Sequence, residues 1–351
     1  MACRSQCPTT TYGASHLGAS GGAVLGRSPV RCESGVAVTS RRYVRRLRTV
    51  VRRYGAPWFS PVAAWLRREP LILLYHRVEP APYETGIHAV TPETFDHHMA
   101  LLQRSYEIIH VDELYARYAA AKEVRGLAAV TFDDGHRSVL DHALPILMRR
   151  HIPATSFLIG GLLRGGSYWR HTIHQVRNAG LSALFTTFLR NPAVRAEYLI
   201  QDTKDPRRIA SDEIAEACVR FAYEHALSSS RADYPTADIY RSLDTRGLLR
   251  FGSHTRHHYM LSSVPDHVVE LEISGGREDL LGSGLLTSSL LAIPFGGDHT
   301  FRESTYRLAI SSGHTGILQS HGTRTTRALP LAGPQRLYRF MPSSRDRLIA
   351  L

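Results

Sequence analysis

The sequence contains little cysteine and no long run of apolar residues. Four of its 351 residues are cysteines, three of them within the first 32 positions, too few and too unevenly placed for a disulfide framework. No segment approaches the roughly 18 consecutive apolar residues that a membrane-spanning helix requires. Residues 1–40 also lack the continuous apolar stretch of a secretory signal peptide. These absences predict a protein of the cytoplasm or of the cytoplasmic face of the membrane.

Acidic residues are nearly absent from the N-terminal fifth of the chain. Residues 1–68 hold twelve arginines, no lysine and a single acid, Glu33, so this segment accounts for about +11 of the formal net charge of +12. The remaining chain is therefore close to neutral, and we expect no nucleic-acid partner for it. Arginine outnumbers lysine 41 to 2 in the whole chain, which indicates compositional bias more than selected contacts.

This basic segment divides into two parts. Residues 1–40 are mostly small and show no periodicity, which predicts a disordered tail. Residues 41–68 begin with RRYVRRLRTVVRR at 41–53, where apolar residues recur at helical spacing, so we predict a basic amphipathic helix. Such a helix either contacts an anionic membrane surface or packs its apolar stripe on the folded domain, and both interpretations stay open.

From residue 69 onward, short apolar segments alternate with helical patterns. The strand-like segments are LILLYHRV, YEIIHV, LAAVTFDD, ATSFLIG, RFGSHT, LLAIPFG and HTGILQ, and helical patterns cover 94–104, 138–150 and 266–281. This alternation predicts an α/β fold with a parallel sheet or barrel over residues 69–351. The interval of about 168–247 has helical patterns without strand alternation, and we interpret it as a helical insertion.

Two clusters of polar residues follow apolar segments. The sequence TFDDG places Asp133 and Asp134 side by side after a strand-like run, where two like charges repel unless a cation or a donor lies nearby. The sequence SHTRHH places His254 and His258 four positions apart, so the two would share one face if the turn were helical. His257 would then point elsewhere.

These clusters together fit a catalytic metal site. Asp134, His254 and His258 would make a set of two histidines and one carboxylate that leaves positions open for water and substrate. Asp133 would remain free as a general base. Taken alone, the histidines also fit an exposed cluster, and DDG also fits a turn with a helix N-cap. Zinc suits these ligands best, with Co²⁺, Ni²⁺, Mn²⁺ and Fe²⁺ as alternatives.

The paired motifs resemble those of the polysaccharide deacetylase family, carbohydrate esterase family four. The family's hallmarks are T-F-D-D-G and H-[ST]-x-x-H, and both are matched without a gap at Thr131–Gly135 and His254–His258. The resemblance extends over roughly residues 70–342. It implies a distorted TIM-like (β/α) barrel with fewer than eight complete repeats, to which this chain adds the helical insertion and the basic N-terminal extension.

The resemblance also implies roles for single residues. By position, Asp134, His254 and His258 match the family's metal ligands, and Asp133 matches its general base. AIPFG is similar to the family's third motif and implies the backbone N–H of Phe295 as a donor to the oxyanion. That motif commonly begins with arginine, whereas this chain has Ala292 there, and Arg339 is the candidate that takes over the orienting role.

The resemblance predicts a metal-dependent hydrolase that removes acetyl groups from N-acetylated amino sugars in a cell-envelope glycan, oligosaccharide or glycolipid precursor. The alternatives are an O-acetyl esterase, an amidohydrolase of non-carbohydrate substrates and a catalytically silent glycan-binding scaffold. The late aspartate-tryptophan and leucine-x-histidine motifs of the family have no good match, so the general acid is unassigned. His76, His136 and His299 lie beside strand-like segments and are open candidates.

Overall fold

The computed structural model describes residues 69–80, 88–228, 232–321 and 336–342. The predicted disordered tail at 1–40 and the predicted basic helix at 41–68 lie outside the described residues.

Within these ranges, parallel strands close into a barrel of seven. Strand β1 pairs with β5 on one side and with β10 on the other, and the remaining neighbours follow in the order β10-β9-β8-β7-β6-β5. The seven strands are β1 (Leu71–Tyr75), β5 (Leu127–Phe132), β6 (Ala154–Leu158), β7 (Leu249–Ser253), β8 (Leu290–Ala292), β9 (Gly316–His321) and β10 (Arg336–Phe340). The short β4 (Glu107–Ile108) adds to the start of β5, and β2 (Arg77–Val78) pairs with β3 (Ala89–Val90). The predicted barrel with fewer than eight complete repeats is confirmed.

The strands are apolar on both faces because both faces are covered. Every residue of β1 and β5 is buried, which explains their continuous apolar sequences LILLY and LAAVTF. Alternate residues serve different parts of the core. Leu73 and Val130 pack with residues of the flanking helices, whereas Ile72 and Ala129 pack with residues of β8, β9 and β10.

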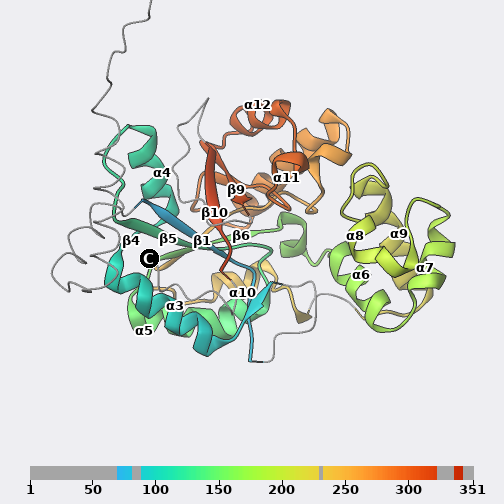
Figure 1. The fold of residues 1–351 in the computed structure, drawn as a ribbon, viewed down its shortest axis with the longest axis horizontal. Helices are drawn as coiled ribbons and strands as arrows, with labels where there is room; N and C mark the ends of the chain where they lie inside the picture. Colours follow the sequence, from blue (N-terminus) through green and yellow to red (C-terminus); the bar gives the residue numbers. More distant parts are fainter. Residues whose placement is uncertain (1–68, 81–87, 229–231, 322–335, 343–351) are drawn as a thin grey trace, which may run out of the picture. The chain divides into compact units, whose positions relative to one another are not determined.

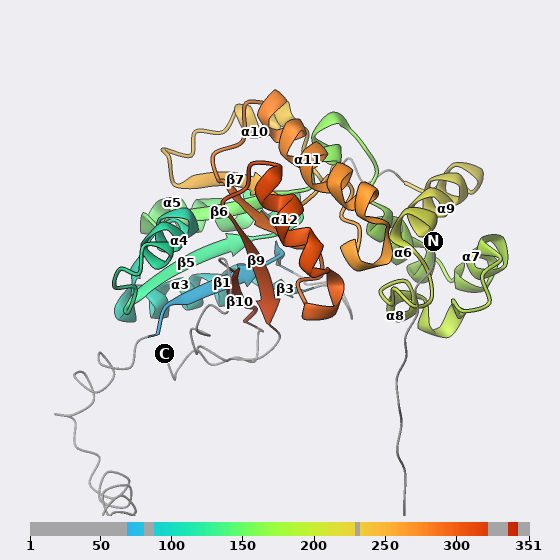
Figure 2. The ribbon, with the colours of Figure 1, turned by 90° about the horizontal axis from the view of Figure 1, so that it is seen from above.

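Helices connect most of the strands and cover the barrel. The main ones are α3 (Pro92–Ser105), α4 (Val111–Ala119), α5 (Leu144–Arg150), α11 (Asp266–Gly282) and α12 (Glu303–Ser311), with a π-helical turn, η1 (Val139–Ala143), before α5. Thr91 caps α3 through a hydrogen bond from the Thr94 N–H to its hydroxyl oxygen. Figure 2 shows α3, α4 and α5 on one flank of the strands and α11 and α12 on another.

The interval between β6 and β7 is helical, as interpreted from the sequence. It contains η2 (Gly160–Arg164), α6 (Trp169–Asn178), α7 (Ser182–Leu189), η3 (Ala196–Tyr198), α8 (Leu199–Asp202), α9 (Ser211–Glu224) and α10 (Ala237–Arg241). Helices α6 to α9 gather beside the strands (Figure 1) and share a separate apolar core that includes Ile173, Phe185, Ile214 and Phe221. We call residues 168–247 the helical insertion. None of the helices in the described ranges is long and apolar enough to cross a bilayer.

Candidate metal centre and its cavity

The two aspartates follow β5 at the carboxyl end of the barrel. Strand β7 ends at Ser253, so His254 emerges at the same end because the strands are parallel. The turn after β5 is left-handed at Asp134 (φ 69°) and Gly135 (φ 76°). A Cβ on Gly135 would lie 2.8 Å from Leu158 Cδ2, so both the backbone and the available space require glycine there.

Asp134, His254 and His258 converge on one point. Asp134 Oδ1 lies 3.4 Å from His254 Nε2 and 3.3 Å from His258 Nε2, and one ligand atom from each residue falls within 4.8 Å of the other two. Asp134 Oδ1 is buried and lacks a well-formed hydrogen bond within the described chain. A buried carboxylate oxygen facing two imidazole nitrogens is the donor set of a divalent transition metal, so these residues fit such an ion.

The loop after β7 brings the two histidines together without a helical turn, which corrects the expectation from their spacing. Thr255 (φ 62°) and His258 (φ 61°) are left-handed, and the His258 N–H donates to Thr255 Oγ1 at 3.2 Å. The i, i+4 argument therefore paired the correct residues for the wrong reason. His257 points elsewhere, as expected, and its Nδ1 lies 2.6 Å from Glu272 Oε1.

Hydrogen bonding fixes which nitrogen of His254 faces Asp134. His254 Nδ1 lies 2.8 Å from the carbonyl oxygen of Ala292, and because a carbonyl only accepts, Nδ1 carries the proton. Burial alone would lower the pKa of His254, but the carboxylates of Asp133 and Asp134 raise it above the ordinary value. Burial lowers the pKa of His258 to about 3, so that imidazole is neutral and able to bind a metal.

Asp133 is held by an arginine from the last described strand. Arg339 Nη1 donates to Asp133 Oδ1 at 2.6 Å and Nη2 donates to Oδ2 at 2.7 Å, a bidentate pair between two buried side chains 206 positions apart. Burial by itself would raise the pKa of Asp133, but Arg339 and His254 hold it below the ordinary value. Asp133 is thus a fixed carboxylate at neutral pH. Asp134 also titrates below its ordinary pKa, because His254 and His258 outweigh its burial.

Phe295 follows β8 in a strained turn beside the same point. Its backbone is left-handed (φ 63°), which is unusual for an aromatic residue, and its ring centroid lies 4.8 Å from that of His258. No described residue accepts a hydrogen bond from the Phe295 N–H. That donor is therefore available to a bound group.

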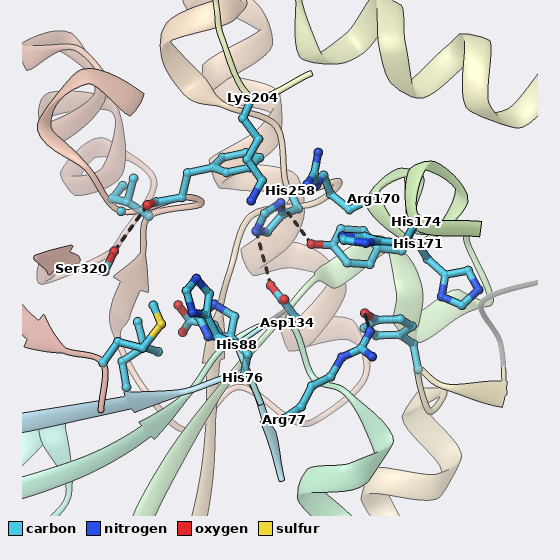
Figure 3. Close-up of a pocket in the computed structure, with 18 residues that line it drawn as sticks. His76, Arg77, His88, Asp134, Arg170, His171, His174, Lys204, His258 and Ser320 are labelled. Carbon is cyan, nitrogen blue, oxygen red and sulfur yellow. Dashed lines mark hydrogen bonds and ion pairs between the residues drawn. The ribbon is translucent and has the colours of Figure 1, made fainter. Parts of the chain in front are cut away.

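A cavity of about 150 Å³ opens over these residues. Figure 3 shows Asp134 and His258 at its centre, with basic side chains around them. Its lining includes Leu74, His76, Arg77, His88, Asp133, Asp134, Tyr168, Arg170, His171, His174, Lys204, Tyr234, His258, Ile293, Phe295, Gly296, Ser320 and Met341. The barrel and the helical insertion thus both contribute to one cavity.

Comparison with known proteins agrees with this geometry. A family model described as "Polysaccharide deacetylase" matches residues 121–316, more than half of the chain and a range that contains both motifs. The chain belongs to the polysaccharide deacetylase family. A comparison with curated protein sequences found no match. The resemblance inferred from the motifs is confirmed.

Two solved structures with the same fold have similar sequence identities and TM-scores to this deacetylase. The Streptococcus pyogenes deacetylase PplD, in complex with acetate, is 17% identical with a TM-score of 0.52, covering 78% of this chain and 92% of that one. IcaB from Ammonifex degensii is 18% identical with a TM-score of 0.51, covering 79% of this chain and 92% of that one. At these identities the likeness shows a shared fold.

The three histidines left open as acids have different surroundings in this deacetylase. His76 lines the cavity, and burial lowers its pKa. His136 lies outside the lining, with Nδ1 2.8 Å from Ser138 Oγ, and His299 is exposed. Tyr168 also lines the cavity, with its hydroxyl 3.5 Å from His258 Nδ1.

The motifs did not point to the basic residues of the cavity. Arg77, Arg170 and Lys204 line it, and they lie outside both hallmark motifs. Lys204 carried one signal, because it is one of only two lysines in a chain that otherwise uses arginine.

Proposed function

We propose that this protein is a metal-dependent N-deacetylase that hydrolyses the acetamide of N-acetylated amino sugars. The substrate class we propose is a cell-envelope glycan, an oligosaccharide or a glycolipid precursor. One observation carries the proposal: Asp134, His254 and His258 converge next to a second carboxylate, Asp133, that is held in place by Arg339. A protein that only binds glycans gains nothing from keeping two carboxylates so close together.

Asp134 Oδ1, His254 Nε2 and His258 Nε2 would hold the metal. Zinc fits one carboxylate and two imidazoles best, although Co²⁺, Ni²⁺, Mn²⁺ and Fe²⁺ accept the same ligands. A divalent cation bound there lowers the pKa of a water molecule and polarises a carbonyl group. The Nδ1–H of His254, donating to the Ala292 carbonyl, orients the ring so that Nε2 faces the site, and a metal there would bind the tautomer with Nε2 unprotonated.

Asp133 serves as the general base. Its two oxygens accept hydrogen bonds from Arg339, which fixes the carboxylate plane and keeps it ionised so that it can accept the proton of the attacking water. Arg339 is therefore a positioning residue. After the tetrahedral intermediate forms, the protonated Asp133 returns the proton to the leaving amine.

The Phe295 N–H stabilises the negative charge that develops on the acetamide oxygen. Backbone donors aimed at a developing oxyanion typically contribute a factor of roughly 10²–10³ in rate. The left-handed backbone of Phe295 and the cavity lining support this role.

Acetate release tests the proposal. The purified protein is assayed with N-acetylglucosamine oligomers and with O-acetylated xylan, after chelation of metal and again after zinc is added back. We expect zinc to restore acetate release from the oligomers and not from the xylan. Release from the xylan alone would instead identify an O-acetyl esterase. Silence on both substrates with metal bound would favour a non-carbohydrate amide or a silent scaffold.

A further inference from the structure

The helical insertion contributes one buried cation, Arg170, and one half-buried cation, Lys204, that the proposed hydrolysis does not use. Arg170 on α6 is only 4% exposed, and its Nη1 donates to Thr203 Oγ1 at 3.0 Å. Its guanidinium carbon lies 5.2 Å from the centroid of the Trp169 ring. The other terminal nitrogen, Nη2, is buried and has no hydrogen-bond acceptor among the described residues. Arg170 thus lines the cavity with one terminal donor unused.

Lys204 follows α8 and enters the same cavity. Figure 3 shows its side chain reaching toward His258, with Arg170 on the other side of that ring. Burial and the neighbouring charge of Arg170 lower the pKa of Lys204 to about 8. A lysine whose pKa is lowered by a neighbouring arginine is stabilised in its charged form when an anion lies between or beside the two cations.

The other charges near the cavity have partners, and these two do not. Arg339 is paired with Asp133, and Arg77 lies 3.9 Å from Glu79. Among the described residues no carboxylate oxygen lies within 4.0 Å of Arg170 or of the Lys204 amine, whereas Asp134 faces two histidines. The Asp134 carboxylate stabilises the charge of both cations only from a distance. Desolvated cations without an anion in direct contact are costly for the fold, and a ligand that supplies that anion reduces the cost.

We infer that Arg170 and Lys204 form an anion-binding subsite, and that the substrate is an N-acetylated amino sugar carrying a phosphate or a carboxylate. This inference rests on the proposed deacetylase function and narrows its substrate class. Because the subsite shares a cavity of about 150 Å³ with Asp134 and His258, the anion belongs to the sugar that carries the acetamide or to its direct neighbour. Arginine and lysine bind both anions through charge-assisted hydrogen bonds.

Substrate preference and a matched set of variants test the subsite. Zinc-loaded protein is assayed for acetate release from N-acetylglucosamine, its 1-phosphate, its 6-phosphate and N-acetylglucosaminuronic acid. We expect a KM at least roughly tenfold lower for one anionic sugar, the effect of a single charge-assisted contact. The arm that shows this preference identifies phosphate or carboxylate as the anion.

Lys204→Met and Arg170→Gln should bring the KM ratio between neutral and anionic sugars close to one. Lys122→Met and Arg220→Gln are the controls, since Lys122 is the other, exposed lysine and Arg220 is an exposed residue of the same insertion, and both should keep the ratio. If Arg170→Gln does not fold, Lys204→Met alone decides.

The inference and the proposed function fail in different ways. Equal KM values for neutral and anionic sugars in the unaltered protein would overturn the subsite and leave the deacetylase standing. If no sugar releases acetate, calorimetric titration of the zinc-loaded protein with the phosphorylated and carboxylated sugars decides the subsite separately. Binding that weakens in Lys204→Met would support it, and absence of binding would refute it.

Discussion

The barrel rim, meaning the loops after β5, β7 and β8, lines one cavity together with the helical insertion. The two regions differ in whether their charged residues have partners. On the rim, Asp133 is paired with Arg339, and His254 is bound to the carbonyl of Ala292. In the insertion, Arg170 and Lys204 line the cavity, and neither forms an ion pair with a described carboxylate. A group that must keep one position during a reaction needs fixed partners, whereas a group that selects a ligand needs an unused hydrogen-bond donor or charge. This difference supports the proposal that the rim carries the chemistry and that the insertion selects the substrate.

The cavity-lining residues of the two regions also differ in backbone conformation. The rim holds Asp134, His258 and Phe295 in left-handed turns, a conformation that non-glycine residues rarely adopt. The insertion residues Arg170 and His174 lie on the regular helix α6. Strain of this kind persists only where the surrounding structure enforces it, so the rim should tolerate change less well than the insertion.

Removing a rim carboxylate should have the largest effect and should separate the two aspartates. Asp134→Asn should lose the metal and with it all activity, because a neutral amide replaces the negatively charged ligand. Asp133→Asn should keep the metal and lower kcat by about 10²–10⁴-fold, the usual contribution of a general base. Metal content by mass spectrometry and acetate release check both variants. Equal metal content in the two would contradict this division of roles.

Breaking the Asp133–Arg339 pair should weaken both fold and activity. Arg339→Gln leaves a buried carboxylate unpaired, which typically costs about 3–5 kcal/mol in the free energy of unfolding. Without Arg339, burial raises the pKa of Asp133, so the acid limb of the kcat profile should move to higher pH. Urea unfolding and pH-rate profiles measure both effects.

The pH dependence of stability has a definite sign. In the unaltered protein the folded-state pKa of Asp133 is depressed, so its stabilisation is full above the unfolded pKa of about 3.9 and is lost as the pH falls through the folded pKa. In Arg339→Gln that pKa is higher, because burial is then opposed only by the nearby histidines. The gap in unfolding free energy between the two proteins should therefore narrow as the pH falls from 7 toward 3. A gap independent of pH would contradict the pairing.

Two glycine substitutions compare rim and insertion directly. Gly135 and Gly180 both have positive φ, at 76° and 71°, but a Cβ on Gly135 would meet Leu158 and Tyr240, whereas one on Gly180 meets nothing within 4 Å. Gly180→Ala should cost about 1–2 kcal/mol, the price of a left-handed alanine. Gly135→Ala should cost more and also weaken metal binding. Thermal unfolding with and without zinc measures both, and similar costs would refute the contrast.

The smallest effect is expected where the insertion touches a proposed metal ligand. The Tyr168 hydroxyl lies 3.5 Å from His258 Nδ1, too far for a strong hydrogen bond. Tyr168→Phe should therefore lower kcat by less than about tenfold. Tyr223→Phe, on an exposed residue of α9, is the control and should leave kcat unchanged. A loss as large as that of Asp133→Asn would move Tyr168 into the proposed catalytic set.

The sequence by itself determined the parallel strands of the barrel and the cavity residues that directly follow those strands. Continuous apolar runs such as LAAVTF predicted buried parallel strands, and parallel strands place their carboxyl ends on one rim. Asp134 and His254 follow two such strands, so local patterns placed both residues at the same end of the barrel. Strand β10 and helix α12 were not predicted, because their short segments carry no such clear pattern.

The contacts among the cavity residues, and the part of the lining that the helical insertion supplies, were decided only by the tertiary structure. The pairing of Arg339 with Asp133 joins residues 206 positions apart, and the backbone that turns His258 toward Asp134 is not the helix that its spacing predicted. Arg170 and Lys204 reach the cavity because the insertion folds around its own apolar core beside the barrel. Local sequence patterns indicate which face of a helix or strand is buried. Long-range packing decides which side chains contact one another, and such contacts produce no periodic pattern in the sequence.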